Sequence, residues 1–281
     1  MNESLRIFTQ RISKLPTIPP IADKIIELVG TRDAYMDSLV ETIEKDPAIS
    51  GKVISFSNTA FFRLGRPVTN ISDAVMKIGF DNVKGIALGI SLLTVFKADN
   101  AGRKAEYMQI FRHCLAVGVI ANEIEEHLGC EDREDVFTSG LLHDIGMMVM
   151  HSFFPDVTER VNQMVKKGKK YLEAENEVYG FTHCDVGAWL ADQWNLPSRL
   201  HEAIYCHHYL SRAVMHRRTA AVVHIADNLA IKNGCSPILS DGFEDKLDEA
   251  AMSAIGLTRT QLAAIEKKMD KVIPSVQDIC R

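Results

Sequence analysis

Apolar residues recur at helical spacing along most of this chain. The first stripe covers 21–29, with apolar side chains at i, i+4, i+7 and i+8, and it follows Pro19-Pro20. Proline is tolerated in the first turn of a helix, because the amide hydrogen that it lacks has no partner there. Asp46-Pro47 repeats this arrangement before a second apolar stripe over 49–56. No run alternates with a period of two residues between turn residues, so the pattern predicts an all-α fold.

Start and stop residues divide the rest of the chain. Ser72 can cap a short helix over 73–78 that Gly79 ends, and Asp81 opens an apolar stretch that reaches Phe96. Further helices are predicted over 106–127, 134–150, 156–166, 184–194, 198–208, 219–231 and 258–268. The polar stretch 99–103 is the best subdomain boundary, and 236–248 is the least structured part. We therefore expect an N-terminal helical bundle over 1–102 packed on a larger helical unit over 103–281.

Composition and charge narrow the class of protein. With 281 residues, 46% of them hydrophobic, the chain can bury a core without disulfides. A net charge of −5 gives no support to general nucleic-acid or membrane-surface binding. The longest apolar run, 85–96, is too short to cross ~30 Å of hydrocarbon, and no signal peptide is evident. The six cysteines form no C-x-x-C pair, which is typical of reduced thiols. We expect a soluble, cytoplasmic protein.

Histidine is the unusual feature of the composition, with ten in the chain. His143-Asp144 closes an apolar helical segment and combines an imidazole nitrogen with a carboxylate oxygen, which suits Mn, Fe, Ni or Zn. Successive helical residues point ~100° apart, so both reach one ion only if it lies between them. Asp227 lies in the apolar segment 222–229, where a carboxylate needs a partner. The candidate metal ligands are His113, His143, Asp144, His183, His207, His208 and Asp227.

The order of these residues resembles the HD superfamily of metal-dependent phosphohydrolases, over roughly 106–230. In that family the first His, the His-Asp pair and the last Asp hold one divalent ion, and the intervening histidines hold a second in binuclear members. The resemblance thus implies one or two ions (Fe, Mn, Ni, Zn or Mg), with Asp144 catalytic if the centre is active. Adjacent residues rarely bind the same ion, so His207 is favoured over His208 as a ligand.

The N-terminal half narrows the resemblance. Four runs carry it: Leu15-Pro16-Thr17-Ile18-Pro19-Pro20, Asp46-Pro47-Ala48, Ser57-Asn58-Thr59-Ala60-Phe61-Phe62, and Ile71-Ser72-Asp73-Ala74-Val75 through Ile78-Gly79. Together with the HD-like part, about 12–230, they resemble the HDOD family, the HD-related output domain. Its members are bacterial, all-helical proteins usually placed in signal transduction, without demonstrated hydrolase activity. The resemblance implies a signalling output module that retains a divalent metal centre and binds a signalling protein or a small phosphorylated ligand.

Two departures bear on catalysis. Met147 stands where many HD enzymes and the cyclic-di-GMP hydrolases of the HD-GYP type have lysine. Tyr209-Leu210-Ser211 follows His207-His208, where those hydrolases have their Gly-Tyr-Pro signature. We therefore do not expect cyclic-di-GMP hydrolysis of that type. A metal-dependent phosphohydrolase acting on a nucleotide or another phosphoester stays open as the alternative, and so does an Fe-dependent oxygenase.

Several other residues have simpler interpretations. Cys114, Cys184 and Cys206 each adjoin a proposed ligand, but neighbouring helical side chains diverge, which favours ordinary core packing. His183 is also a candidate helix-start residue beside Thr182. His201, His216 and His224 match no family position and are interpreted as surface or core residues. The lysine run over 166–170 is interpreted as a solvated helix end, with a phosphate or partner site as its alternative.

Overall fold

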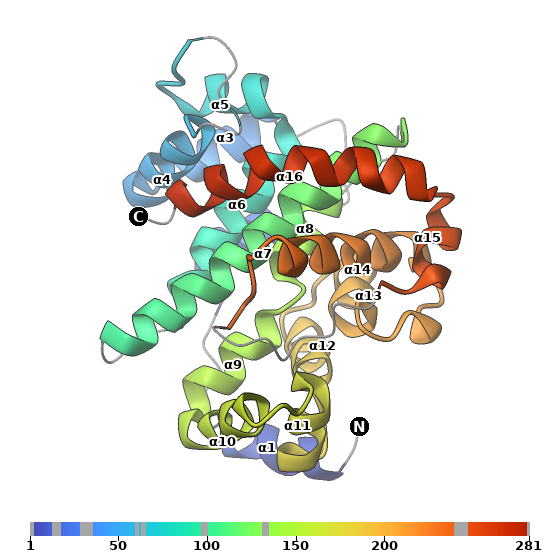
Figure 1. The fold of residues 1–281 in the computed structure, drawn as a ribbon. Helices are drawn as coiled ribbons and strands as arrows, with labels where there is room; N and C mark the ends of the chain where they lie inside the picture. The colour runs from blue at the N-terminus through green and yellow to red at the C-terminus, as the bar shows by residue number, and fades with distance from the viewer. Residues whose placement is uncertain are drawn as a thin grey trace.

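The computed structural model describes residues 3–12, 18–28, 36–59, 62, 66–96, 101–130, 135–238 and 247–279. Within these residues every regular element is a helix, which confirms the predicted all-α fold (Figure 1). Residues 15–17 of the first motif, Ala60 and Phe61 of the third, 99–100 of the predicted boundary, 239–246 and Cys280 lie outside the described residues.

The helices follow the chain without interruption by strands in the described ranges. The first group is α1 (Glu3–Arg11), α2 (Pro20–Glu27), α3 (Met36–Glu44), α4 (Pro47–Ser57), α5 (Ile71–Ile78) and α6 (Phe80–Leu93). The second is α7 (Ala101–His127), α8 (Val136–Leu142), α9 (Ile145–Phe153), α10 (Pro155–Lys166), α11 (Tyr171–Tyr179), α12 (His183–Gln193), α13 (Ser198–Cys206), a 3₁₀ turn η1 (Leu210–Arg212), α14 (Arg217–Lys232), α15 (Glu249–Ile255) and α16 (Arg259–Ile279).

The predicted Asp46-Pro47 start and Gly79 stop are confirmed, whereas α6 begins at Phe80 instead of Asp81 and ends at Leu93 instead of Phe96. The Asp46 carboxylate accepts hydrogen bonds from the amides of Ala48 and Ile49, and Pro47 occupies the first position of α4. Gly79 ends α5 at a φ of +88°, which favours glycine. The prediction that Ser72 caps α5 is wrong, because the cap is the side chain of Asn70.

The N-terminal helices gather around α6, and α1 stands apart from them. Helices α2, α3, α4 and α5 all pack on α6, which in turn packs on α8 (Figure 1). By contrast, α1 lies beside α10 and α11, where Phe8 contacts the rings of Phe154, Tyr179 and Phe181. The subdomain boundary at 102 stays a prediction, and the structure adds that α1 joins the second half of the chain.

Close helix crossings place the second half around α7 and α8. Long α7 packs on α8, α14 and α16, while α12 lies between α9 and α13. At the α7–α8 crossing a Cβ on Gly140 would lie 2.7 Å from the backbone of Gly118, so the two helices meet at glycine.

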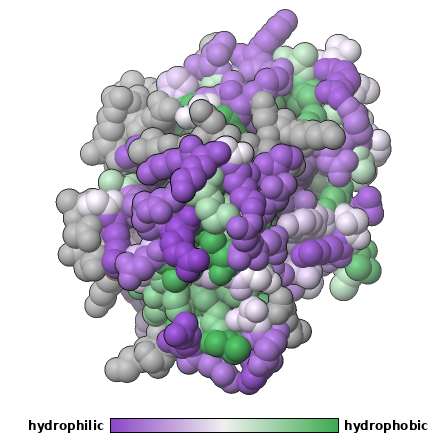
Figure 2. All heavy atoms as spheres, turned by 60° about the horizontal axis from the view of Figure 1, so that its bottom comes forward, coloured by the Kyte–Doolittle hydropathy of each residue, from purple (hydrophilic) through white to green (hydrophobic). Residues whose placement is uncertain are grey.

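No described helix is long and apolar enough to span a membrane. The face of the molecule in Figure 2 is mostly hydrophilic, with smaller hydrophobic areas between.

The predicted helix over 134–150 is wrong in one respect that matters for the site. Helix α8 ends at Leu142 and α9 begins at Ile145; His143 keeps helical backbone angles, and the chain departs from them at Asp144. Asp144 has φ −99° and ψ 17°, and its side chain forms no cap hydrogen bond with α9. The change of direction at Asp144 lets its carboxylate approach the same point as the His143 imidazole, 3.3 Å away.

Candidate metal centre

All seven predicted ligands lie together in the interior of the second half. His113 comes from α7, His143 and Asp144 from the break between α8 and α9, and His183 from the first position of α12. His207 and His208 directly follow α13, and Asp227 lies in α14. Six of the seven are buried, and His208 has a side chain that is 12% exposed. Their mutual distances define two groups of donor atoms.

The first group contains the ligands that the family resemblance assigns to one ion. His113 Nε2 lies 3.1 Å from Asp227 Oδ1 and 3.5 Å from Asp144 Oδ2. His143 Nε2 lies 3.3 Å from the same Asp144 Oδ2 and 3.2 Å from His113 Nε2. Donors about 2.1 Å from an ion lie about 3.0 Å apart along octahedral edges and about 3.4 Å apart along tetrahedral ones. These spacings fit one metal ion.

The second group shares Asp144 with the first through the other carboxylate oxygen. Asp144 Oδ1 lies 3.2 Å from His183 Nε2 and 3.6 Å from His207 Nε2, and those two nitrogens are 3.4 Å apart. Ligand atoms of His183, Cys184, His207 and His208 all lie within 4.8 Å of one another. Asp144 therefore occupies the position of a bridging carboxylate between two potential ion sites.

Hydrogen bonds at Nδ1 orient four of the imidazole rings. Nδ1 of His113 lies 2.7 Å from the Cys235 carbonyl, and Nδ1 of His143 lies 2.7 Å from the Gly140 carbonyl. His207 Nδ1 lies 2.9 Å from a carbonyl oxygen of α13, and His183 Nδ1 lies 2.8 Å from Glu175 Oε2. These oxygens only accept, so each neutral ring carries its proton on Nδ1 and directs the Nε2 lone pair into the site.

That arrangement leaves acceptors facing acceptors. Neutral His113 and His143 place two lone pairs 3.2 Å apart, and the buried Asp144 Oδ1 accepts no hydrogen bond although two imidazole nitrogens are near. A buried carboxylate oxygen without a partner is costly. A cation would satisfy all of these groups, and outer hydrogen bonds at Nδ1 are typical of metal-binding histidine. The residues present therefore fit a divalent metal.

The charge state of the carboxylates agrees with this fit. Burial alone would raise the pKa of Asp144, but the neighbouring histidines, His143 above all, hold it well below its usual range. Burial likewise opposes ionisation of Asp227, and the His113 imidazole beside its carboxylate outweighs burial, so the pKa of Asp227 is also lowered. Both groups are carboxylates at neutral pH. They supply the negative charge that a divalent ion requires.

Two residues of the centre were not among the predicted ligands. Buried Glu175 of α11 accepts hydrogen bonds from the amide and Nδ1 of His183. Cys184 is buried, as predicted, but its Sγ lies 3.8 Å from His207 Nε2 instead of packing away from the site. Burial would raise the pKa of this thiol, yet His207 and His183 lower it to about 7. Nothing in the spacing of Glu175 singles it out in sequence.

The histidines interpreted as ordinary surface or core residues lie outside the two groups. His201 pairs with Asp192 and is partly exposed, while His216 contacts the Ser198 hydroxyl. His224 is buried, and its Nδ1 lies 2.8 Å from the carbonyl of His207. It therefore supports the backbone of a candidate ligand without facing the site.

Comparison with known proteins places the chain in a family. The family model of the HDOD domain matches residues 15–210, well over half of the chain. The chain belongs to the HDOD family. Six of the seven candidate ligands fall within the matched residues of this HDOD protein, and Asp227 lies beyond them.

Solved structures share the fold. An HDOD domain protein of unknown function from Geobacter sulfurreducens superposes with a TM-score of 0.85 at 21% identity, covering 98% of this chain and 97% of that one. A protein from Marinobacter aquaeolei VT8, whose name proposes signal transduction, superposes with a TM-score of 0.77 at 20% identity. The match covers 99% of this chain and 66% of that one. A protein from Shewanella amazonensis SB2B, whose name proposes a metal-dependent phosphohydrolase, superposes with a TM-score of 0.64 at 18% identity, and the match covers 97% of each chain.

The curated relative is larger than this chain. An uncharacterized protein of Treponema pallidum (strain Nichols) is 24% identical over 205 residues. The match covers 72% of this HDOD chain but only 39% of the relative. This chain therefore spans well under half the length of that relative.

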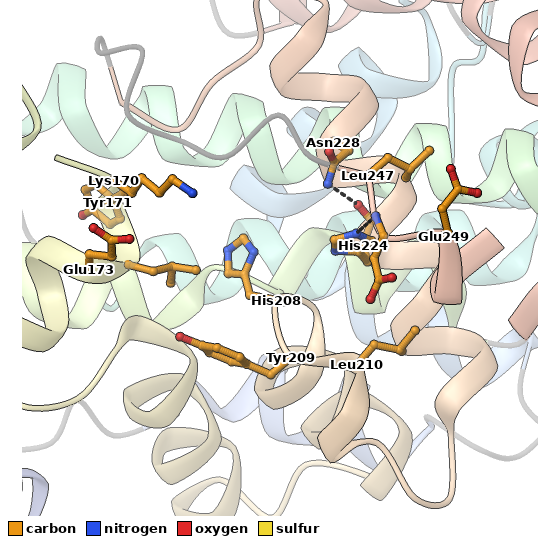
Figure 3. Close-up of a pocket in the computed structure, with 12 residues that line it drawn as sticks. Lys170, Tyr171, Glu173, His208, Tyr209, Leu210, His224, Asn228, Leu247 and Glu249 are labelled. Atoms are coloured by element: carbon orange, nitrogen blue, oxygen red, sulfur yellow. Dashed lines mark hydrogen bonds between the residues drawn. The ribbon is translucent and has the colours of Figure 1, made fainter. Parts of the chain in front are cut away.

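A pocket of about 560 Å³ meets the centre at His208. In Figure 3, His208 lies between Lys170 and Glu173 on one side and His224 and Asn228 on the other. Three carboxylates and one ammonium group line this pocket, a net charge of −2 with the histidines neutral. Six buried ligands lie behind His208, so the half-buried histidine forms the contact between pocket and centre.

Proposed function

We propose that this HDOD protein is a signalling output module organised around a His–Asp centre for one or two divalent ions. The observation that carries the proposal is the convergence of imidazole Nε2 atoms on two buried carboxylates with no hydrogen bond to Asp144 Oδ1. The donors come from α7, the α8–α9 break, α12, the end of α13, and α14. A change at the centre therefore reaches most of the second half of the chain.

Several features favour signalling over hydrolysis. Met147 is uncharged and fully buried, so this position offers no cationic side chain that could bind a phosphate. Six ligands are buried, and the pocket reaches the centre only through His208 among them. The net charge of −2 along the pocket repels a phosphate anion unless bound metal offsets it. These features suit a centre that holds a conformation.

An exposed apolar pair between two ligand-bearing helices supports an output role. Val214 and Met215 are 86% and 74% exposed on the segment that joins α13 to α14. The Glu202 carboxylate accepts hydrogen bonds from the amides of Val214, Met215 and His216, which holds this segment in place. Because His207 and His208 precede it and Asp227 follows it, the centre can set its position for a partner protein.

A metal-dependent phosphohydrolase is the second candidate. The pocket of about 560 Å³ is large enough for a nucleotide-sized ligand, and Lys170 lies at its edge (Figure 3). A bound divalent ion would supply the positive charge that polarises a phosphoryl oxygen. In that case Asp144 would be the residue whose loss abolishes turnover.

One experiment separates the two functions. Wild type and Asp144→Ala are incubated with Mn²⁺, Fe²⁺, Ni²⁺ or Zn²⁺ and with the chromogenic substrate bis(p-nitrophenyl) phosphate. We expect at least one metal to raise the Tm of the wild type but not of the variant, with no turnover above that of the variant. Binding at 100 times Kd stabilises by about 2.7 kcal/mol, which thermal unfolding resolves. Turnover that Asp144→Ala abolishes would favour the hydrolase, and an unchanged Tm with every metal would contradict the metal centre.

A further inference from the structure

The thiol of Cys184 lies among the donors of the second group. Cys184 directly follows His183 in the first turn of α12, and its side chain is fully buried. Sγ is 3.8 Å from His207 Nε2, within the set of four ligand atoms that lie no more than 4.8 Å apart. The thiol therefore faces the same space as the two imidazole nitrogens.

An independent observation indicates that this space is a ligand site. Asp144 Oδ1 is buried without a hydrogen bond, and it lies 3.2 Å from His183 Nε2 and 3.6 Å from His207 Nε2. The unpartnered oxygen lies beside both nitrogens, and the thiol lies 3.8 Å from one of them, which gives four candidate donors around the pair of imidazoles. Structural zinc sites usually have four such ligands.

Local backbone geometry explains how two adjacent helical residues share one site. The Thr182 and Asp185 side chains form a capping box that fixes the start of α12, and His183 and Cys184 occupy its first two positions. On the other side, Gly146 lies so close to the carbonyl of His183 that a Cβ would be 2.0 Å from the oxygen. The first turn is thus held firmly while His207 enters from the end of α13.

The spacing matches a tetrahedral site with one sulfur ligand. With metal–sulfur and metal–nitrogen bonds of about 2.3 and 2.05 Å, a tetrahedral angle places sulfur and nitrogen about 3.6 Å apart and two nitrogens about 3.4 Å apart. The observed distances are 3.8 Å for Cys184 Sγ to His207 Nε2 and 3.4 Å between the two Nε2 atoms.

We propose that Cys184 is a thiolate ligand of the second ion, together with His183, His207 and Asp144. This inference rests on the proposed function, because it requires the His–Asp centre to bind metal. A sulfur ligand favours Zn²⁺ or Fe²⁺ over Mg²⁺ and Mn²⁺, which prefer oxygen. The two groups would then differ in selectivity, since the first contains only nitrogen and oxygen donors.

The test uses Co²⁺, because a thiolate bound to Co²⁺ gives a charge-transfer absorption in the near ultraviolet. Metal-free wild type, Cys184→Ser and the matched control Cys206→Ser are loaded with Co²⁺, and bound cobalt is measured in the same samples. Cys206 is also buried beside a candidate ligand, but it belongs to neither donor group of the described residues. We expect the absorption in wild type and Cys206→Ser and its loss in Cys184→Ser, with the first site still loaded.

The outcomes distinguish this inference from the proposed function. Wild type that binds about two equivalents of cobalt without the absorption, or Cys184→Ser that retains it, overturns the thiolate ligand but keeps the metal centre. Wild type that binds no cobalt overturns both. If Cys184→Ser does not fold, the wild type decides together with Cys206→Ser and Cys114→Ser, because loss of the absorption in either control contradicts the assignment. Zn²⁺ affinity at the second site is expected to fall at least 10-fold in Cys184→Ser.

Discussion

The crossing of α9 and α12 is the contact on which the second donor group most depends. Gly146 is the second residue of α9, and a Cβ built there lies 2.0 Å from the carbonyl oxygen of His183 and 2.7 Å from the amide nitrogen of Gly187. Both are backbone atoms, so no side-chain rotation relieves the clash. Gly146→Ala must therefore move one helix relative to the other.

The size of the effect follows from these distances. Real Cβ atoms essentially never approach another heavy atom closer than 3.0 Å, so the helices must separate by at least 1.0 Å. Overpacking of this kind costs about 1–3 kcal/mol, and a backbone clash belongs near the upper end. For a chain of 281 residues, a loss of about 2–3 kcal/mol lowers the Tm by about 3–5 °C. The shift also carries His183 away from Asp144 Oδ1, now 3.2 Å away. We expect the second ion to bind about 10- to 100-fold more weakly.

Thermal unfolding and metal titration of matched variants check this. Gly187→Ala meets Cγ2 of buried Ile204 at 2.6 Å and the backbone of Gly146 only at 3.4 Å, so it should be milder, because its close contact is with a side chain instead of the backbone. Gly51→Ala in α4 meets nothing within 4 Å and should stabilise by about 0.5–1 kcal/mol, as alanine does in a helix. If Gly146→Ala melts like the wild type and keeps both metal sites, the close α9–α12 crossing is refuted.

Three further predictions address other parts of the molecule. Glu175→Gln keeps the shape of the outer partner of His183 but removes its charge, and should weaken metal binding about 10- to 100-fold in calorimetric titration. Lys84→Met leaves buried Asp135 without its ion-pair partner. We expect the free energy of unfolding, measured by chemical denaturation, to fall by about 3–5 kcal/mol, and adding Asp135→Asn to recover part of this loss. Burial lowers the pKa of Lys84, but the charge of Asp135 outweighs it, so the pKa lies above its ordinary value of 10.5. The contribution of this pair to the free energy of unfolding is therefore complete below about pH 10.5, and it is lost as the pH rises through the higher pKa of the folded state. Lys84→Met should reduce this fall of stability with pH. Met147→Lys places an ammonium group in the core and should lower stability without creating phosphodiesterase activity, a result that a chromogenic assay and a melting curve test together.

Sequence patterns predicted those elements whose ends carry strong local signals. The Asp46-Pro47 start of α4 and the Gly79 end of α5 follow from hydrogen bonding and backbone preference that act within a few residues. Helices α1, α3, α11 and α15 were not predicted, because each has only seven to nine residues and two or three buried ones; α2 is as short, but Pro19-Pro20 marks its start. Packing against a neighbouring helix stabilises such short helices: α11 packs on α10, and α15 packs on α14.

The sequence nominated the residues of the candidate site but not their geometry. The order of His113, His143-Asp144 and Asp227 was sufficient to nominate them, since a family resemblance depends on sequence order. The break between α8 and α9 was not predictable from periodicity, because apolar residues continue on both sides of it. Contacts such as Glu175 to His183 join separate helices, and no local pattern reports them.

Metal content tests most directly whether the His–Asp centre binds a divalent ion. Untagged wild type and the double variant His143→Ala/Asp144→Ala are loaded with Fe²⁺, Mn²⁺, Ni²⁺ or Zn²⁺, desalted, and measured by plasma mass spectrometry, with folding of both checked by circular dichroism. The double variant removes a ligand of the first group and the carboxylate shared by both groups. We predict about one to two equivalents of at least one metal in the wild type and loss of that metal in the folded variant. A folded wild type that retains no metal under any of these conditions would contradict the account.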